Sequence, residues 1–381
     1  MVESAIPLWN SAPQQPDTVS DRFLGCLLGG AVGDALGAPV EFMSRSEILR
    51  VYGPEGVTSY RTAYGRLGAI TDDTQMTLFT AEGLLRGWVR ACQKGITTYS
   101  GVTAHAYLRW LRTQGESNDN ALELGLNEPG WLMLHPELHA RRAPGNTCLS
   151  ALRAMRSLGE PARNDSKGCG GVMRSAPVGL FAWRLGQSRA PQDTFRLGSQ
   201  LAALTHGHPT GALSGGFLAV LILGLADGAS LSEVLVTAKA CLRLEPYHEE
   251  MLAAVEMAEM LAASGLPSAA AVARLGAGWI AEEALAISVY SALVAADFRE
   301  GVLRAVNHDG DSDSTGAIAG NLLGAMFGAK AIPDAWLAPL ELRSVISEIA
   351  NDLYSFRDWN SSEHAEDRQS DENIWRKYPG F

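Results

Sequence analysis

Glycine recurs at every fourth residue in two otherwise apolar stretches of this chain. The two rows are Gly25, Gly29, Gly33 and Gly37, and Gly316, Gly320, Gly324 and Gly328. A glycine inside a helix costs roughly 1 kcal/mol relative to alanine, so two such rows need a compensating reason. Residues four apart form one ridge on a helix, and a ridge without side chains lets another helix approach closely. The rows predict helices over 22–37 and 315–329 that each pack unusually close to a neighbour. The alternative is that small residues only keep these helices compact in a crowded core.

Apolar residues recur at helical spacing from Arg22 onward. The stretches with this pattern are 76–90, 103–111, 148–158, 172–184, 196–205, 211–226, 231–243, 249–263, 280–296, 316–329 and 339–356. Alternating strand patterns bounded by turn residues are almost absent. We therefore expect an all-α fold, with residues 21–381 forming a single compact multi-helix domain.

The first 20 residues differ from the rest of the chain. They are polar, contain Pro7, Pro13 and Pro16, and show no helical pattern; the cluster 6–9 is their one apolar feature. We interpret residues 1–20 as an N-terminal extension. Its cluster either docks on the protein's own surface or anchors a partner, because tryptophan is favoured at binding hot spots.

Charge and cysteine content exclude several classes of function. A net charge of −11 without a basic cluster argues against a nucleic-acid partner. The five cysteines are scattered and lack CxxC spacing, so neither a disulfide framework nor a zinc site is predicted, and a cytoplasmic location fits best. No secretory signal pattern begins the chain. The most apolar stretch, 211–226, contains four glycines and is short for a membrane span, so we predict a buried helix and no membrane partner.

Two runs of oxygen-bearing side chains stand where helical patterns begin. They are Thr71-Asp72-Asp73-Thr74 and Asp311-Ser312-Asp313-Ser314. Such hard donors are the ligands that Mg²⁺ and Mn²⁺ prefer. Successive residues at a helix N-terminus fan out by about 100°, so the first run cannot face one ion but can straddle two. The runs predict a shared dinuclear metal centre, unless they serve only as helix N-caps.

The glycine rows connect these runs to Glu41. The first row ends close to Glu41, and the second begins directly after the run that contains Asp311 and Asp313. Close packing of the two helices would therefore bring Glu41 and both aspartate runs into one site.

Three loop segments are further candidates. A helical pattern follows a glycine loop made of Gly168, Cys169, Gly170 and Gly171, and backbone amides at such a position suit a phosphate. The spacing matches neither a P-loop nor a Rossmann turn, and a plain flexible turn is the alternative. The segment 114–147 is rich in turn-forming residues, and loops of this length are usually functional. His206 and His208 lack a third ligand for zinc, which favours a substrate contact or a buried imidazole.

Several of these motifs together resemble the ADP-ribosylglycohydrolase family, which contains the dinitrogenase-reductase-activating and ADP-ribosylarginine hydrolases. The matching segments, in the order expected for that family, are 25–37, 70–76, 168–174, 205–209, 278–284, 310–316 and 377–381. The resemblance extends over roughly residues 22–381 and implies an all-α domain with two Mg²⁺ or Mn²⁺ ions in a cleft.

The resemblance also implies roles for individual residues. The implied metal ligands are Thr71, Asp72, Asp73, Asp311, Asp313 and Ser314. Glu41 would lie beside the metals and, with Asp72 and Asp73, is a candidate for proton transfer. The glycine loop would hold the diphosphate, with His206 as a further substrate contact. Cys169 departs from the asparagine of many members, so a side-chain contact with ribose or phosphate is less expected there.

The implied activity is metal-dependent hydrolysis of ADP-ribose from a modified protein side chain. The run 205–211 is similar to the arginine-specific branch, which favours arginine-linked substrates; serine and O-acetyl linkages are alternatives. A binding or immunity protein that grips an ADP-ribosyltransferase toxin, with the N-terminal extension as anchor, is a non-enzymatic alternative. Helical terpene synthases also use Asp-rich helices, and 351–355 resembles half of their second motif, but Trp359 stands where that motif requires glutamate.

Overall fold

The computed structural model describes residues 6–9, 15–122, 130–359 and 368–380. Residues 1–5 and 10–14 of the N-terminal extension, part of the long segment 114–147, and Phe381 of the closing motif lie outside the described residues.

The described chain is mostly helical, as expected. Its α-helices are α1 (Pro16–Gly37), α2 (Arg45–Tyr52), α3 (Asp72–Lys94), α4 (Tyr99–Thr113), α5 (Asn146–Ala154), α6 (Ala176–Arg184), α7 (Pro191–Ala203), α8 (Pro209–Ala226), α9 (Leu231–Arg243), α10 (Glu249–Ala263), α11 (Ser268–Leu275), α12 (Ala281–Leu293), α13 (Phe298–Val306), α14 (Ser312–Phe327), α15 (Asp334–Leu337), α16 (Arg343–Ser355) and α17 (Arg368–Lys377). Within the described ranges, β-structure is limited to two isolated bridges. The all-α, single-domain prediction is confirmed for these residues.

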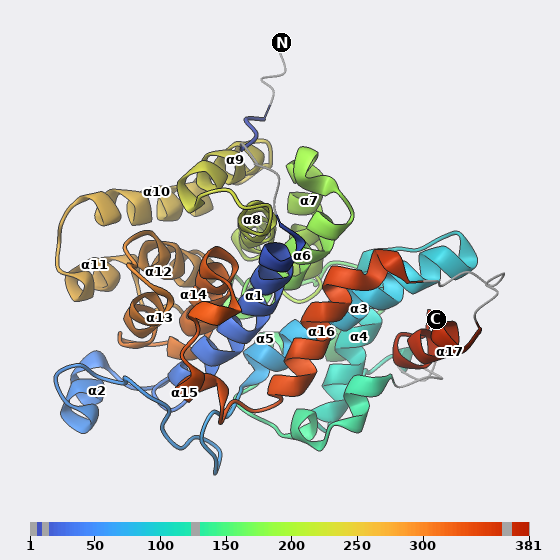
Figure 1. Ribbon diagram of the computed structural model, residues 1–381, viewed down its shortest axis with the longest axis horizontal. Helices are drawn as coiled ribbons and strands as arrows, with labels where there is room; N and C mark the ends of the chain where they lie inside the picture. Colours follow the sequence, from blue (N-terminus) through green and yellow to red (C-terminus); the bar gives the residue numbers. More distant parts are fainter. Residues whose placement is uncertain (1–5, 10–14, 123–129, 360–367, 381) are drawn as a thin grey trace.

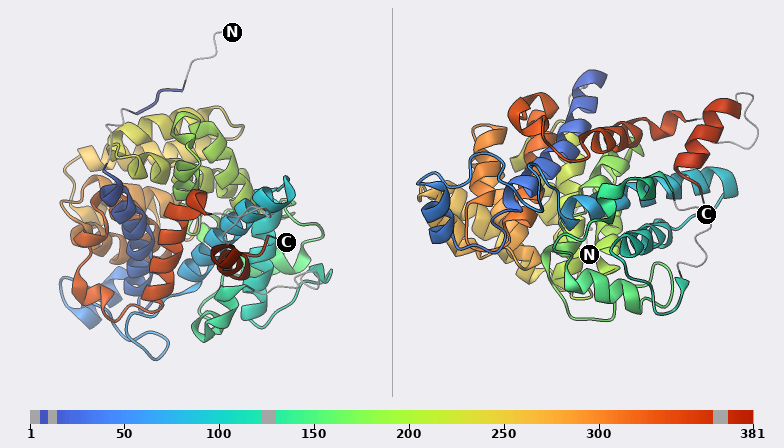
Figure 2. Two further views of the ribbon diagram at one scale, coloured as in Figure 1. Left: turned by 45° about the vertical axis from the view of Figure 1, so that its right-hand side comes forward. Right: turned by 90° about the horizontal axis from the view of Figure 1, so that it is seen from below.

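The helices surround a central group formed by α1, α8 and α14. In Figure 1, α10 to α13 lie on the left of this group and α3, α4 and α17 on the right. Figure 2 shows the same separation from two other directions. One continuous cluster of buried apolar side chains connects both sides.

The glycine rows form the contact between α1 and α14. A Cβ atom added to Gly33 would lie 1.9 Å from the carbonyl oxygen of Gly316, and one added to Gly320 would lie 2.0 Å from that of Gly29. The two helices therefore touch through their backbones, and the neighbour that each row predicted is the other row. Where α1 ends, a Cβ added to Gly37 would lie 2.2 Å from the backbone carbonyl oxygen of Ser312. This packing brings the start of α14 against the end of α1.

The start of α1 corrects one expectation. The helix begins at Pro16, so the expected lack of helix is wrong for residues 16–20. Proline fits the first turn of a helix, because the N–H that it lacks has no partner there. Val19 is already buried in the core. The helical domain thus begins within the segment that we assigned to the N-terminal extension.

Other helix bounds differ by a few residues. The pattern over 148–158 is helical only to Ala154, because Met155 takes an extended conformation with ψ 130°. In the stretch 339–356 the helix begins only at Arg343, because Leu342 has a left-handed conformation with φ 54°. The short helices α2, α11, α13, α15 and α17 were not predicted, since few turns give little periodicity. The apolar stretch 211–226 lies in α8, which is 89% buried, as expected for a core helix.

The apolar cluster of the N-terminal extension docks on the protein itself. Trp9 is 4% exposed, and its indole N–H donates to Asp227 at 2.8 Å. The hydroxyl of Thr237 donates to the carbonyl oxygen of Pro7 at 2.6 Å. Asp227 follows the last residue of α8, so this contact lies about 27 Å from the N-terminal end of that helix. Of the two interpretations of the cluster, the structure shows docking on the protein's own surface.

We expect Trp9→Ala to lower the free energy of unfolding by roughly 1–3 kcal/mol, because it removes a buried ring and leaves Asp227 one hydrogen bond short. Urea denaturation of the full chain measures this change. Leu8→Ala is the matched control, since Leu8 is 39% exposed and should cost far less. Equal midpoints for both variants and the wild type would show that the docked cluster contributes nothing to stability.

Candidate active site

The ends of α1, α3 and α14 meet at one cavity of about 210 Å³. The residues that line it are Glu41, Asp72, Asp73, Ala143, Gly145, Asn146, Thr147, Cys148, Gly168, Cys169, Gly170, Met173, His206, Trp279, Asp311, Asp313 and Ser314. Residues from both aspartate runs, the glycine loop and His206 are therefore brought together. Of the site residues predicted from the sequence, Thr71 and Gly171 do not line the cavity.

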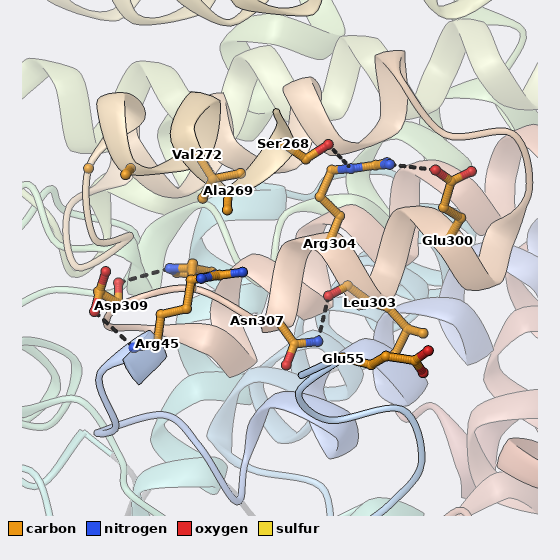
Figure 3. A pocket seen from close by; sticks show the side chains of 13 residues that line it. Arg45, Glu55, Ser268, Ala269, Val272, Glu300, Leu303, Arg304, Asn307 and Asp309 are labelled. Carbon is orange, nitrogen blue, oxygen red and sulfur yellow. Dashed lines mark hydrogen bonds and ion pairs between the residues drawn. The ribbon is translucent and has the colours of Figure 1, made fainter. Parts of the chain in front are cut away.

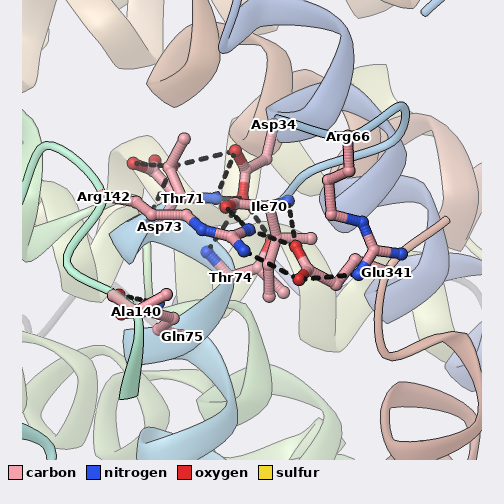
Figure 4. Close-up of polar contacts among 10 residues, drawn as sticks. All are labelled: Asp34, Arg66, Ile70, Thr71, Asp73, Thr74, Gln75, Ala140, Arg142 and Glu341. Atoms are coloured by element: carbon pink, nitrogen blue, oxygen red, sulfur yellow. Dashed lines mark hydrogen bonds and ion pairs between the residues drawn. The ribbon is translucent and has the colours of Figure 1, made fainter. Parts of the chain in front are cut away.

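Thr71 instead organises the first turn of α3, together with a residue that we did not predict. Asp34, fully buried on α1, accepts hydrogen bonds from the backbone N–H groups of Thr71 at 3.0 Å and Thr74 at 3.2 Å, and from both threonine hydroxyls (Figure 4). The hydroxyl of Thr71 also accepts from the N–H of Asp73 at 3.3 Å. Burial and the Asp313 carboxylate raise the pKa of Asp34 to about 7. An aspartate in the otherwise uncharged, glycine-rich stretch that follows Arg22 was the signal that could have identified it.

Five further carboxyl groups crowd the cavity. Glu41, Asp72, Asp73, Asp311 and Asp313 are each no more than 7% exposed. Burial, followed by repulsion from Asp313 and Asp311, raises the pKa of Glu41 to about 10. Burial and repulsion from Asp313 also hold the pKa values of Asp72, Asp73 and Asp311 well above the ordinary range. Such a cluster favours protons or bound cations, because buried carboxylates repel one another.

The donor set fits Mg²⁺ or Mn²⁺ by its chemistry. Two buried oxygens, Oε2 of Glu41 and Oδ1 of Asp73, have no hydrogen-bond partner in the described part of the chain. Hard, anionic oxygens from two helix ends are typical ligands of these ions. Among the described residues, however, no three His, Cys, Asp or Glu side chains already stand in a geometry that would hold one ion. The fit is therefore one of chemistry, and the dinuclear centre stays a prediction.

A buried ion-pair cluster holds the segment that leads into α3 (Figure 4). Glu341, 1% exposed, accepts from the backbone N–H of Ile70 at 3.1 Å and from Arg66 at 2.9 Å, and it pairs with Arg142 at 2.8 Å. Arg142 in turn donates to the carbonyl oxygen of Ile70 at 2.9 Å. Arg142 directly precedes the segment 143–147 that lines the cavity, so this cluster fixes two walls of the site together. No sequence pattern connected these residues.

The glycine loop is fixed more firmly than a flexible turn. Arg174, which is buried, donates to the carbonyl oxygen of Gly170 at 2.9 Å. The N–H of Cys169 donates to the carbonyl oxygen of Trp279 at 3.2 Å, and that of Gly168 to the hydroxyl of Ser166 at 3.4 Å. Two of the amides expected to receive a diphosphate thus already have acceptors. The glycine loop as a diphosphate site therefore stays a prediction.

The side chain of Cys169 faces the aspartates. Its Sγ donates to Oδ2 of Asp311 at 2.8 Å, and the hydroxyl of Ser314 lies 3.5 Å from the same sulfur. Burial and the neighbouring Asp311 and Asp73 carboxylates hold the pKa of the thiol well above its usual value. Cys169 therefore acts as a neutral hydrogen-bond donor to Asp311.

His206 is a buried imidazole at the cavity wall, which was one of the two predicted roles. Its Nδ1 lies 2.8 Å from the hydroxyl of Thr205, which also accepts from Arg174 at 2.7 Å. Burial and Arg174 lower the pKa of His206 to about 3, so the ring is neutral. His208 instead caps α8, with Nδ1 accepting from the N–H of Thr210 at 3.2 Å.

A second cavity, of about 250 Å³, lies beside the loop that leads into α14 (Figure 3). Arg304 spans one side of it, bonded to Ser268 at 2.9 Å and paired with Glu300. On the other side, Asp309 accepts from the backbone N–H of Arg45 at 2.8 Å. None of the site residues predicted from the sequence lines this cavity.

The segment that suggested a terpene synthase lies outside the acidic cavity. Asp352 accepts a hydrogen bond from the hydroxyl of Tyr378 at 2.5 Å and pairs with Lys377. Its role is to dock the C-terminal residues on α16, so a second metal motif is not formed there.

Comparison with known proteins gives one consistent family. The family model described as ADP-ribosylglycohydrolase matches residues 15–362. The ADP-ribosyl-[dinitrogen reductase] glycohydrolase of Rhodospirillum rubrum is 28% identical over 340 residues, which cover 86% of this chain and 92% of that protein. The ADP-ribosylarginine hydrolase Tri1 of Serratia proteamaculans (strain 568) is 26% identical, over 92% of this chain and 85% of its own length.

The solved structures agree with this result. A chain described as an ADP-ribosylglycohydrolase-related protein complex superposes with a TM-score of 0.62 and 28% identity, covering 89% of this chain and 99% of that one. The shared fold therefore extends over nearly the whole helical domain.

Proposed function

We propose that this chain, which belongs to the ADP-ribosylglycohydrolase family, uses the acidic cavity to hydrolyse the bond between ADP-ribose and a modified arginine side chain. The single observation that carries the proposal is the joining of both aspartate runs, Glu41 and the glycine loop in one cavity. These elements come from distant parts of the sequence, and a common substrate or ion set would account for their meeting in one cavity.

The acidic wall suits the charge that develops in this reaction. Cleavage of a glycosidic bond passes through a transition state with positive charge on the sugar ring. The carboxyl groups of Glu41, Asp72 and Asp311 surround the space where that sugar would lie. Stabilisation of developing charge by fixed groups in a buried site is usually the largest catalytic effect.

Glu41 is our candidate for the proton transfer. Its Oε2 has no hydrogen-bond partner among the described residues, so this carboxyl group is available to exchange a proton at the cavity. A positioned acid of this kind can pass its proton to the leaving nitrogen. Asp72 is less suited, because its Oδ2 already accepts from the N–H of Gly145 at 3.2 Å.

The proposed cofactor is a pair of Mg²⁺ or Mn²⁺ ions. The residues that would hold it are Asp72, Asp73, Asp311 and Asp313, with the hydroxyls of Thr71 and Ser314. Such ions, when bound, supply electrostatic stabilisation and a more acidic water. Two hydrogen bonds would orient these ligands: one between Asp34 and Thr71, and one between Cys169 and Asp311.

The toxin-binding alternative gains no support from the N-terminal extension. Trp9, the residue that would anchor a partner, is buried against Asp227 at the end of α8 that lies away from His206. A chain that begins at Gln15 lacks residues 1–14, including Trp9, and keeps α1 whole, and we expect it to hydrolyse ADP-ribosyl substrates as the full chain does.

We expect release of ADP-ribose from arginine-linked peptide to exceed release from serine-linked peptide by roughly tenfold or more, since a linkage preference of this size needs only about 1.4 kcal/mol. This expectation rests on the similarity of the run 205–211 to the arginine-specific branch, and the same run packs against the glycine loop at the cavity. Initial rates on peptides of the same sequence, modified at either residue, measure it. Faster release of ADP-ribose from the serine-linked peptide would show that the chain prefers the serine linkage.

A further inference from the structure

Two aromatic side chains stand exposed at the mouth of the cavity. Phe42, which directly follows Glu41, is 73% exposed, and Trp279, which lines the cavity, is 42% exposed. Their rings stack with centroids 5.7 Å apart and planes 21° apart. Single exposed apolar residues need no explanation. A stacked aromatic pair at the rim of a polar cavity, however, offers a flat surface to a ligand group.

The backbone around Trp279 is fixed by the site itself. Its carbonyl oxygen accepts from the N–H of Cys169 at 3.2 Å, and the carbonyl oxygen of Ala277 accepts from the N–H of Asp311 at 2.9 Å. Gly278, with φ 81°, makes the turn between them, close against Asp311. An exposed ring on a backbone bonded to both the glycine loop and the aspartate loop is a rigid contact surface.

Phe42 is held by a tight turn after α1. The N–H of Val40 donates to the carbonyl oxygen of Gly37 at 2.8 Å, and beyond the turn the N–H of Arg45 donates to Asp309 at 2.8 Å. The turn therefore directs the side chain of Glu41, which is 7% exposed, into the cavity, and the ring of Phe42 into solvent. Consecutive residues thus face the cavity and the solvent.

The position of the rings identifies which part of a substrate they meet. The modified side chain belongs to a whole protein that cannot enter a cavity of about 210 Å³, so it approaches Glu41 from the exposed side. The group next to the sugar in an arginine linkage is a planar guanidinium. This group stacks on aromatic faces and is attracted by a cluster of buried carboxyl groups.

We propose that Phe42 and Trp279 form the receiving surface for the guanidinium of the modified arginine and thereby select this linkage. This inference rests on the proposed function and adds its specificity-determining residues. A serine linkage has no planar cation to stack, so the pair discriminates between the two substrates without contacting ADP-ribose.

The test compares Phe42→Ala and Phe42→Trp in the full chain with Mg²⁺ present. For Phe42→Ala we expect kcat/KM on arginine-linked peptide to fall by roughly 3- to 30-fold, the range of a cation–π contact. We expect Phe42→Trp to retain it, and the affinity for free ADP-ribose, measured by calorimetry, to change by less than about twofold in both variants. Ile96→Ala is the control, since Ile96 is 69% exposed and follows α3 at its opposite end.

Two outcomes would overturn the inference. One is an unchanged kcat/KM in Phe42→Ala. The other is an equal loss of ADP-ribose affinity, which would place the rings against the nucleotide instead of the arginine. Failure of the proposed function is distinguishable, because it would appear as a wild-type protein that releases no ADP-ribose from either linkage.

Discussion

Replacement of Asp311 by alanine is expected to abolish release of ADP-ribose, with a fall in rate on the order of 10³-fold. Asp311 lies where the start of α14, the glycine loop and the acidic cavity meet, and its loss removes an anionic oxygen pair from the centre of the proposed metal site. Asp72→Ala should have the same effect from the wall formed by α3. Hydrolysis of arginine-linked peptide by the purified variants measures both.

The fold should survive these substitutions. Asp311 caps α14 by accepting from the N–H of Ser314 at 3.2 Å, and loss of such a cap costs roughly 1 kcal/mol. Removal of one carboxyl group from a repelling cluster offsets part of that cost. Asp297→Ala is the matched control, because Asp297 also caps a helix, by accepting from the N–H of Glu300 at 2.7 Å, but lies outside the acidic cavity. Full activity in Asp311→Ala or Asp72→Ala, or undiminished activity in excess chelator, would refute the metal-site account.

The second large effect concerns stability, and we expect Gly33→Leu to lower the free energy of unfolding by roughly 3 kcal/mol or more. A Cβ at this position would lie 1.9 Å from the backbone oxygen of Gly316, and a backbone cannot rotate aside as a side chain can. Gly320→Leu should behave alike, because its Cβ would lie 2.0 Å from the oxygen of Gly29. Separation of α1 from α14 would also disturb the cavity, so activity should fall with stability.

A pair of alanine variants isolates the cause. Gly33→Ala meets backbone, whereas Gly101→Ala, in the first turn of α4, meets only the hydroxyl of Thr98 within 3 Å. Helix propensity favours alanine over glycine at both positions, by up to roughly 1 kcal/mol. We expect urea denaturation to show Gly33→Ala destabilised and Gly101→Ala near neutral. Unchanged stability in both leucine variants would remove the argument from close packing.

The helix crossing could be predicted from the sequence because the contact requires glycine at fixed positions in both helices. Only glycine permits two backbones to touch, so the rows in α1 and α14 mark the contact itself. The crossing then implied that Glu41 and the aspartate runs share a site, and the cavity brings them together. The start of α1 was missed although Pro16 at a first helical turn was a usable signal.

Other parts of the site left no local pattern. Asp34 accepts a hydrogen bond from Thr71, which is 37 residues away in the sequence, and Arg142 pairs with Glu341, which is 199 residues away. Such pairs depend on loop paths that periodicity does not determine. The stack of Phe42 on Trp279 is of the same kind, since neither residue is unusual in its own segment.

The most direct test of the account is hydrolysis of a peptide with one ADP-ribosylated arginine in water labelled with heavy oxygen, followed by mass spectrometry of both products. The account predicts that the released ADP-ribose carries one labelled oxygen and that the peptide regains an unlabelled arginine, because water attacks the sugar carbon. A peptide that stays modified, or label found in the peptide instead of the ADP-ribose, would contradict it.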